Sequence, residues 1–453
     1  MPLHPRRPRF GRLLDGIFVA LLLFVFVGLG VYHFRRLDLS QVDVDLVREL
    51  AKQKLGEQVG KSTDWPQWRG PSRDGVSTET DILTDWPASG PKVLWEAKVG
   101  EGFSSVAVVK GRVFTIFQDG DNESVVSWDA KSGKEIWRHS YACAYKNSYG
   151  NGPRSTPSVD GDLVYTVGAT GIMHCLKVST ENPNGELVWA KNLLQEFAAP
   201  MPQWGVAFSP LIEGNHIYIM PGGPDGNSLA ALDKSTGAIL WKNLDDPAGY
   251  SSPIAATFQD QRQIVFFTGT RLVGVHPYTG SELWHYNWPT SYYCNVATPI
   301  IAQDYVFLSS GYARGCAMLK IDKIGGQWKP SFVYKHRRIM KTQFGSCVRS
   351  KDHLFGFDDV NLTCMNFHTG EVQWKKEGFD IGSVLLVNDH LIIYGANGLL
   401  ALAEANPKEY VEKSRFQFSA QKRACWSVPV VSNGRLYVRD QAKLVCFDVK
   451  AGK

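Results

Sequence analysis

The sequence offers few residues whose types and spacing could carry out catalysis. The run Asp119-Gly-Asp-Asn-Glu123 supplies the oxygen ligands that Ca²⁺ prefers. It lacks the spacing of a complete calcium loop and falls where a hairpin turn is expected, so we interpret it as a solvated turn. No G-x-S-x-G, H-E-x-x-H, P-loop or C-x-x-C-H pattern occurs, and no two cysteines are adjacent. These observations predict neither a catalytic residue nor a metal site.

Aromatic side chains instead recur in short polar stretches along the chain. Phe, Tyr and Trp alternate there with amides, hydroxyls and one arginine, a mixture that could hold a flat polar ligand or a protein segment. The candidate residues for ligand or partner binding are Phe103, Tyr149, Arg154, Trp204, Tyr250, Asn295, Gln343 and Trp426. The alternative is that these rings only pack the stretches against one another.

Arg154 is the one charged residue among these candidates. Its guanidinium could bind the carboxylate of a ligand through two parallel hydrogen bonds. An internal ion pair with Glu101, from a neighbouring loop, is the alternative.

An internal repeat supplies the elements that would position these residues. From about residue 91, a closing aromatic residue returns about every 40 to 52 residues, and most copies have a glycine four positions before a tryptophan. The clearest copies are Gly133–Trp137, Gly185–Trp189, Gly237–Trp241, Gly280–Trp284 and Gly370–Trp374. A turn-forming residue such as Asp129 or Asp233 usually stands four positions before the glycine. This pattern predicts a tight hairpin turn followed by a strand whose buried face begins at the tryptophan.

Each repeat contains four short strands and has a small residue, often before proline, at its other end. Eight closing aromatic residues share about 360 residues, which gives roughly 45 residues a unit, as in a four-stranded propeller blade. We therefore predict an all-β, eight-bladed β-propeller. The chain stops where its last outer strand should begin, and Lys92-Val-Leu-Trp95 can supply that strand and close the ring. The residues expected to dock each blade on its neighbour are Trp95, Trp137, Trp189, Trp241, Trp284, Tyr334 and Trp374, with Phe416 or Phe418 in the remaining blade.

The cysteines follow the same repeat. Cys175, Cys364 and Cys446 occupy one equivalent place in three units, where other units have small residues, so we interpret them as packing residues. Cys294 and Cys347 belong to adjoining units and could form a disulfide if the compartment is oxidising, or could remain reduced.

The repeat resembles the tryptophan-docking repeat of quinoprotein dehydrogenases and of the related outer-membrane assembly propeller. The segments Asp64-Trp-Pro-Gln-Trp-Arg-Gly-Pro-Ser-Arg-Asp-Gly75 and Gly152-Pro-Arg-Ser-Thr-Pro157 resemble bacterial PQQ-binding-like β-propeller repeat proteins of the planctomycete type. The resemblance covers nearly everything after Asp64. It implies the propeller fold and, in the dehydrogenases, pyrroloquinoline quinone with Ca²⁺ held by acidic and amide oxygens. Carboxylates are scarce in the expected loops, so we expect no cofactor, and the quinone with calcium is the alternative.

Charge and hydropathy set the N-terminal region apart. Up to Arg36 the sequence holds six arginines and one acid, which accounts for the whole net charge of +5 and leaves the rest neutral. A neutral body predicts no nucleic-acid binding. The apolar run at 16–32 has arginines on both sides and no A-x-A cleavage site, which predicts an uncleaved signal anchor with a cytoplasmic N-terminus. A cleaved signal peptide or a buried helix are the alternatives.

The predicted organisation therefore has three parts. Residues 1–36 form a cytoplasmic basic tail and transmembrane anchor, and 37–63 form a partly helical stalk. Residues 64–453 form the propeller, with 64–90 as an extension before the blades begin at about 91. A single inner-membrane span would hold the propeller in the periplasm or another extracytoplasmic space.

For function, the sequence favours a non-catalytic binding or scaffold module that recognises a protein segment or small ligand where the loops meet. The alternatives are a quinone-dependent oxidoreductase acting on alcohols or sugars, and a carbohydrate-binding surface protein.

Overall fold

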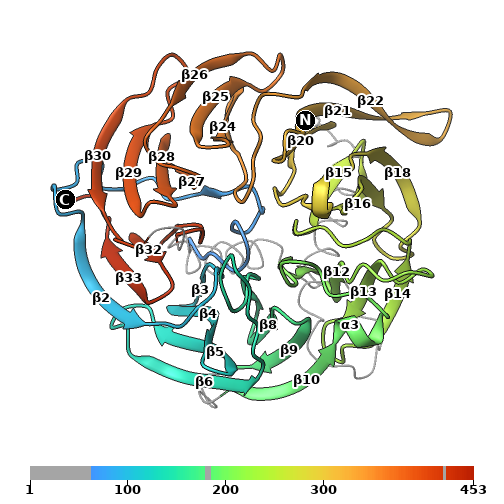
Figure 1. Cartoon of the computed structure of the whole chain (residues 1–453), viewed down its shortest axis with the longest axis horizontal. Coiled ribbons are helices and arrows are strands. Elements are labelled where there is room, and N and C mark those ends of the chain that lie inside the picture. Colours follow the sequence, from blue (N-terminus) through green and yellow to red (C-terminus); the bar gives the residue numbers. More distant parts are fainter. Residues whose placement is uncertain (1–62, 179–184, 422–424, 453) are drawn as a thin grey trace, which may run out of the picture. The chain divides into compact units, whose positions relative to one another are not determined.

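The computed structural model describes residues 63–178, 185–421 and 425–452, which together form a ring of eight sheets (Figure 1). The four main strands of every sheet pair antiparallel. The predicted eight-bladed propeller is therefore confirmed. Helix in the described ranges is limited to α3 (Leu193–Glu196) and the 3₁₀ turn η2 (Ser291–Tyr293).

The expected membrane anchor and nearly all of the expected stalk lie outside the described residues. Among the residues that are described, no helix has both the length and the apolar character needed to cross a membrane.

The first four blades take their strands in chain order from the centre to the rim. Blade 1 contains β3 (Ala107–Val109), β4 (Arg112–Asp119), β5 (Asn122–Asp129) and β6 (Glu135–Ala142), and blade 2 contains β7 (Ser158–Asp160), β8 (Leu163–Val167), β9 (Ile172–Lys177) and β10 (Glu186–Asn192). Blade 3 contains β11 (Leu211–Glu213), β12 (His216–Ile219), β13 (Leu229–Asp233) and β14 (Ile239–Asn243), and blade 4 contains β15 (Ile254–Phe258), β16 (Gln261–Phe267), β17 (Arg271–Val275) and β18 (Glu282–Asn287).

The remaining blades complete the ring. Blade 5 contains β19 (Ile300–Ala302), β20 (Tyr305–Ser310), β21 (Gly315–Ile324) and β22 (Gln327–His336), and blade 6 contains β23 (Val348–Ser350), β24 (His353–Asp358), β25 (Asn361–Asn366) and β26 (Val372–Lys376). Blade 7 contains β1 (Val76–Ser77), β27 (Gly382–Val387), β28 (His390–Gly395), β29 (Leu399–Glu404) and β30 (Glu412–Gln417), and blade 8 contains β31 (Val430–Ser432), β32 (Arg435–Arg439), β33 (Lys443–Asp448) and β2 (Lys92–Lys98).

Burial along the strands reflects their place in the blade. The middle strands β4 and β5 are buried along most of their length, because neighbouring blades cover both of their faces. The outer strand β2 alternates between exposed and buried residues towards its end, because only one of its faces meets another blade. The core is therefore a series of interfaces between blades.

The ring closes with a strand from each end of the domain. Strand β2 pairs antiparallel with β33, from Lys92 opposite Asp448 to Lys98 opposite Lys443. The expectation that Lys92-Val-Leu-Trp95 supplies the missing outer strand is confirmed.

Five of the docking aromatics join their blade to the next through one hydrogen bond, whereas the indole N–H of Trp137 has no partner in the described chain. The indole N–H of Trp95 in blade 8 donates to the carbonyl of Ala130 in blade 1 at 3.0 Å, and that of Trp241 donates to Pro277 of the following blade at 2.7 Å. Trp189, Tyr334 and Trp374 make the equivalent bond with Lys234, Phe367 and Asn406. Trp284 differs, because its N–H donates to the side chain of Gln263 within its own blade.

The glycine of the repeat lies against the docking ring of the preceding blade. A Cβ on Gly133 would come within 2.6 Å of the Trp95 ring, and one on Gly280 within 2.3 Å of the Trp241 ring. Both glycines also have φ near +70°. Glycine is therefore required at this position by the hairpin turn and by the ring that covers it.

The cysteines of the middle strands face the docking rings. Cys175, Cys364 and Cys446 lie opposite Trp189, Trp374 and Trp95 on the neighbouring strand, beside a register shift in the pairing. A small residue at this position leaves room for the indole, as the packing interpretation expected. Cys294 and Cys347, in contrast to the disulfide alternative, are both free and buried.

The chain segment 65–77, which we call the central plug, crosses the middle of the ring. Trp65 pairs with Val108 of blade 1, and the carbonyl of Pro66 accepts from the N–H of Val159 in blade 2. The guanidinium of Arg73 donates to Ser209 in blade 3 at 3.0 Å and to Pro253 in blade 4 at 2.9 Å.

The same plug reaches the other four blades. Trp68 donates to Thr298 at the entrance of blade 5 at 3.0 Å, and Arg69 donates to Cys347 at the entrance of blade 6 at 2.5 Å. Strand β1 pairs in parallel with β27 of blade 7, and Ser77 donates to Val431 of blade 8 at 3.1 Å. Sequence analysis treated 64–90 only as an extension and did not predict that it fills the centre.

The plug starts on one defined face of the ring. Asp64 accepts from the N–H of Lys110, and Thr63 accepts from the N–H of Asn433. Lys110 and Asn433 lie in the turns between the first and second strands of their blades, so we call this side the turn face. The loops that lead into each first strand lie on the opposite side, the entry face.

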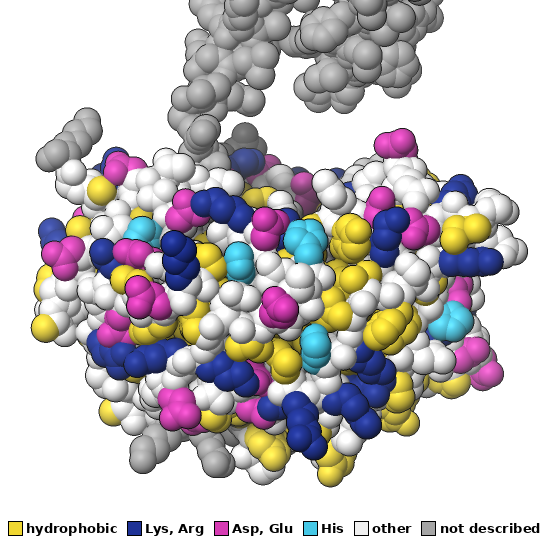
Figure 2. Space-filling model, turned by 90° about the horizontal axis from the view of Figure 1, so that it is seen from above, with side chains coloured by type: hydrophobic (Ala, Val, Ile, Leu, Met, Phe, Trp, Pro, Cys, Tyr) yellow, Lys and Arg dark blue, Asp and Glu magenta, His cyan; other side chains and the backbone are white. Residues whose placement is uncertain are grey.

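The side of the ring shown in Figure 2 mixes acidic and basic side chains, with hydrophobic residues between them. No continuous band of one charge is visible on this side, which agrees with the neutral composition of the body.

Candidate functional site

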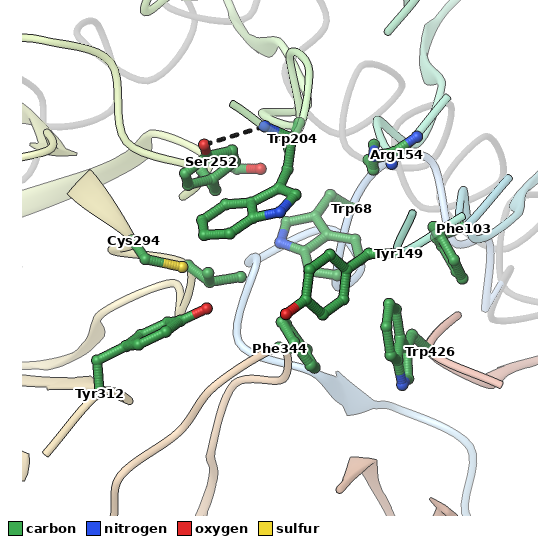
Figure 3. Close-up of a pocket in the computed structure, with 13 residues that line it drawn as sticks. Trp68, Phe103, Tyr149, Arg154, Trp204, Ser252, Cys294, Tyr312, Phe344 and Trp426 are labelled. Carbon is green, nitrogen blue, oxygen red and sulfur yellow. Dashed lines mark hydrogen bonds between the residues drawn. The ribbon is translucent and has the colours of Figure 1, made fainter. Parts of the chain in front are cut away.

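The entry face carries a pocket of about 130 Å³ whose walls are mostly aromatic (Figure 3). Trp68 of the central plug contributes to it, so the plug and the entry loops share this site. The lining residues are Trp68, Phe103, Tyr149, Arg154, Trp204, Ala207, Tyr250, Ser252, Cys294, Val296, Tyr312, Phe344 and Trp426.

Loops from most of the blades build this pocket. Each loop follows the outer strand of one blade and returns the chain to the centre, where the next inner strand begins. Because the rigid ring fixes both ends of every loop, their aromatic residues converge. Six of the eight predicted candidates line the pocket: Phe103, Tyr149, Arg154, Trp204, Tyr250 and Trp426.

Trp204 is the centre of one aromatic cluster. Its ring meets Tyr149 edge-on at 6.0 Å between centroids and Tyr250 at 5.6 Å. It lies within 21° of parallel to the ring of Tyr312, at 6.4 Å. The backbone N–H of Trp204 also donates to the hydroxyl of Tyr250, which holds the loop in place.

A second cluster forms the other side of the pocket. The ring of Trp426 is stacked against Phe103 at 4.8 Å and against Phe344 at 4.5 Å. The rings therefore do pack the loops on one another, as the structural alternative proposed, yet the two clusters leave a cavity between them.

Arg154 braces its own loop and does not pair with Glu101, so that alternative is wrong. Its guanidinium donates to the carbonyls of Gly150 and Gly152, and it lies over the rings of Tyr145 at 4.7 Å and Phe103 at 5.5 Å. Glu101 instead accepts two bonds from the amide of Asn151. Burial lowers the pKa of Arg154 from its usual value.

Two predicted candidates do not line the pocket. The amide of Asn295 is buried and donates to the carbonyls of Thr268 and Trp288, while its oxygen accepts from Ser310. Gln343 packs beside Gly311. A loop position in the sequence does not determine which way a side chain turns: the amide of Asn295 turns into the protein, and the half-buried Gln343 lies beside Tyr312 of the lining.

Seven of the thirteen lining residues were not among the predicted candidates, and two of these, Trp68 and Tyr312, lie outside the loops between blades. Trp68 belongs to the central plug, which lies outside the repeat. Tyr312 lies in the loop between β20 and β21, and loops between second and third strands share the entry face with the loops between blades. The up-and-down order of the strands in each blade was the signal that could have identified Tyr312.

The acidic run at 119–123 is partly exposed to solvent and partly buried. Asp119 and Asp121 are exposed, as a solvated turn requires, but Glu123 is fully buried, so that part of the interpretation is wrong. Glu123 accepts from the hydroxyl of Tyr141 and from the N–H of Ala169 at 2.9 Å, and burial raises its pKa. In the described parts of the chain, no group of three or more His, Cys, Asp or Glu side chains could hold a metal ion.

The pocket does not fit pyrroloquinoline quinone held by calcium. Ca²⁺ needs several converging oxygen ligands, and none of the described residues that line the pocket is an Asp, Glu, Asn or Gln. The pocket is also smaller than the roughly 300 Å³ at which small-molecule sites usually begin. We therefore derive no reaction through this cofactor.

The chain is similar to outer membrane protein assembly factors. The family model described as outer membrane protein assembly factor BamB matches residues 121–376. The outer membrane protein assembly factor BamB of Burkholderia pseudomallei is 26% identical over 385 residues, which cover 82% of this chain and 91% of the relative.

Solved structures agree on the fold. BamB from Moraxella catarrhalis superposes with a TM-score of 0.56 at 13% identity, over 79% of this chain and 99% of the other. Sqt1 from Saccharomyces cerevisiae superposes with a TM-score of 0.51 at 12% identity, over 83% of this chain and 100% of the other. These likenesses show the fold alone. Because the family model spans more than half of the chain, this PQQ-like β-propeller belongs to the family of the outer membrane protein assembly factor BamB.

Proposed function

We propose that this chain is a non-catalytic, extracytoplasmic scaffold that binds a segment of a partner protein at the pocket of the entry face. The observation that carries the proposal is the pocket itself, an aromatic cavity with one charged lining residue, supported by a closed ring of eight blades. Rigid aromatic side chains are typical anchors of protein–protein interfaces, because they bury a large area at little entropic cost.

Exposed apolar residues extend this surface beyond the pocket. Tyr149, Tyr292 and Tyr293 are 51%, 58% and 52% exposed, and Met201, in the loop that carries Trp204, is 47% exposed. Tyrosine and methionine are enriched at the centre of protein interfaces. A partner segment could thus place one side chain in the pocket and cover the surrounding rings.

The polar groups of the pocket are poorly suited to catalysis. The guanidinium of Arg154 is already bonded to two carbonyls. Burial raises the pKa of the Cys294 thiol to about 12, so that it stays protonated near neutral pH. The hydroxyl of Ser252 accepts from the N–H of Ser209, and neither His nor a carboxylate lines the pocket to activate it.

The relatives support the same kind of role. The relative from Burkholderia pseudomallei is named as an outer membrane protein assembly factor, and the matching family model has the same description. By this likeness, we propose that this chain binds a protein partner in an extracytoplasmic compartment. The basic, apolar N-terminal region at 1–36 would attach the propeller to the inner membrane, as its sequence pattern predicts.

Site-specific photo-cross-linking in native membranes tests this function. A photoreactive phenylalanine at position 149 should form a defined protein adduct that mass spectrometry identifies, and the same probe at position 278 on the rim should not. The adduct should disappear when Trp204→Ala is added. Absence of any adduct at positions 149 and 293, or quinone-dependent dye reduction by the purified protein, would contradict the scaffold role.

A further inference from the structure

We propose that the pocket receives the ring of a proline residue from an extended X-Pro segment of the partner. This inference rests on the proposed function, since it specifies the kind of protein segment that the entry face binds. Size, hydrogen-bonding capacity and charge each restrict the occupant.

The size of the pocket limits it to one ring. An apolar cavity of roughly 150 Å³ is known to hold a benzene molecule. The pocket, at about 130 Å³, therefore has room for a single five- or six-membered ring and not for an extended small molecule. The Trp204 cluster on one side and the Trp426 cluster on the other give this ring aromatic walls.

The available hydrogen-bonding groups favour a segment that presents an acceptor to the pocket. The hydroxyl of Tyr149 points across the pocket towards Phe344 in Figure 3, and it has no bonding partner among the described residues. The indole N–H of Trp204 likewise has no partner in the described chain, whereas that of Trp68 is used by Thr298. Among the described lining residues, hydroxyls are the only side-chain oxygens that could accept from an incoming N–H, and no carboxylate or amide oxygen is present.

A proline meets these conditions because its nitrogen carries no hydrogen and the preceding carbonyl is a free acceptor. Extended proline-containing segments have no internal hydrogen bonds and dock in aromatic-lined grooves, where their low conformational entropy limits the cost of binding.

Charge and polarity weigh against other single rings or ring-sized groups. A quaternary ammonium ion also binds in aromatic cages, but the guanidinium of Arg154 lies in the lining and would repel it. A sugar ring would bury several hydroxyls against apolar walls without partners. A proline ring has neither charge nor hydroxyl.

Titration of the purified full chain with a capped hexaproline peptide tests the inference. Tryptophan fluorescence should change in a saturable way, and a capped Gly-Ser hexapeptide should give no saturation. Tyr149→Phe, which removes only the free hydroxyl, should weaken hexaproline binding by roughly fivefold. Trp204→Ala should abolish it, and Tyr278→Ala on the rim, where the ring is 70% exposed, should leave it unchanged.

The outcomes separate this inference from the proposed function. If hexaproline binds and also prevents the photo-adduct at position 149, both proposals are supported. If the adduct forms but hexaproline does not bind, or binds the folded Trp204→Ala variant equally well, the proline inference is overturned and the scaffold role stands. Saturable binding of tetramethylammonium or glucose in place of hexaproline would also overturn it. If neither an adduct nor peptide binding is seen, both proposals fail.

Discussion

Three arginines in the described part of the chain, Arg69, Arg73 and Arg439, are buried and bind mainly backbone carbonyls. Arg69 and Arg73 belong to the central plug, and Arg439 joins blade 8 to the carbonyls of Gly100 and Gly102 before blade 1. Burial lowers the pKa of Arg69 and Arg439 to about 10 and that of Arg73 to about 9, so all three stay charged at neutral pH. Each side chain therefore acts as a cross-link between segments that would otherwise have unpaired carbonyls.

We predict that Arg73→Met lowers the free energy of unfolding by about 3 kcal/mol, because it leaves the carbonyls of Ser209 and Pro253 buried without a donor. Chemical denaturation followed by tryptophan fluorescence measures this loss. Lys134→Met, at an exposed turn position, is the control and should change stability by less than about 0.5 kcal/mol. If the two variants have equal denaturation curves, the hydrogen bonds of Arg73 do not contribute to the stability of the fold.

Two histidines form a second buried group, at the contact between blades 1 and 2. The rings of His139 and His174 lie 5.1 Å apart, and Tyr141 lies 4.3 Å from His174. His139 Nε2 and His174 Nδ1 are buried and have no hydrogen-bond partner in the described chain. Burial, with a smaller effect of His139, lowers the pKa of His174 to about 4.

This pKa predicts a loss of stability in acid. Between pH 6.5 and pH 4 the unfolded chain binds a proton at His174 that the folded protein excludes, so the free energy of unfolding falls by up to about 3 kcal/mol. The buried Glu123, whose pKa is raised, acts in the opposite direction. Denaturation curves measured at several pH values in this range should therefore show that the free energy of unfolding depends less steeply on pH in a His174→Gln variant. If the substitution leaves this dependence on pH unchanged, other groups cause the sensitivity to acid.

The outcome for individual residues shows what a sequence can determine. Loop positions identified six lining residues, because the repeat fixes where each loop lies. The directions of Asn295 and Arg154 depend on neighbouring carbonyls that only the folded loops bring together. Trp68 could not be predicted as part of the pocket, since its contacts are with blades distant in sequence.

At the level of elements, the docking aromatics and the glycines opposite them are two halves of one contact. The sequence predicts the aromatic positions well, because they recur with the blade. It does not predict that the glycine covers the ring of the preceding blade, nor that Trp284 bonds within its own blade. Such contacts join consecutive repeats, and the pattern of one repeat carries no information about its neighbour.

Trp241→Ala should lower the free energy of unfolding by about 3–5 kcal/mol, as expected for the removal of a large buried side chain. The substitution removes the ring and also leaves the carbonyl of Pro277 without its donor. Equilibrium denaturation in guanidinium chloride measures the change. A midpoint equal to that of the parent protein would mean that this ring does not hold blade 3 to blade 4.

The glycine half of the contact can be tested separately. Gly226 and Gly280 both have positive φ, but a Cβ on Gly226 meets nothing within 4 Å, whereas one on Gly280 would come within 2.3 Å of the Trp241 ring. We expect Gly226→Ala to cost about 1 kcal/mol through backbone strain alone. Gly280→Ala should cost about 2 kcal/mol more, because the ring must move. Thermal or chemical unfolding of the pair compares them, and equal losses would exclude the contact with the ring as a constraint.

At the level of the whole molecule, the repeat pattern predicts how the ring closes but does not predict the central plug. The closure of the ring follows from counting strands. The last blade lacks an outer strand after β33, and β2 belongs to no other blade, so the two must pair. The central plug cannot be found in this way, because 65–77 lies outside the repeat and its contacts reach every blade. Since the plug supplies Trp68 to the pocket, the candidate site depends on both features.

The closure of the ring makes the chain connectivity of blade 8 different from that of the other blades. In the other blades the outer strand follows its neighbour directly in the chain, whereas β2 and β33 come from opposite ends of the domain. Glu96 and Lys242 occupy matched positions, each directly after a docking tryptophan and each exposed on an outer strand. Proline at either position removes a backbone donor and disturbs the strand pairing.

We therefore predict that Lys242→Pro loosens the edge of blade 3 alone, because the hairpin between β13 and β14 keeps that strand nearby. Glu96→Pro should weaken the junction that closes the ring, and its free energy of unfolding should fall by at least about 2 kcal/mol more, since closing a long loop opposes reassociation of β2. Denaturation and limited proteolysis of the two variants measure the difference, with cleavage expected before β3 only in Glu96→Pro. If both variants unfold at the same denaturant concentration and resist protease equally, strand exchange between the two ends contributes no more to the stability of the ring than any ordinary hairpin.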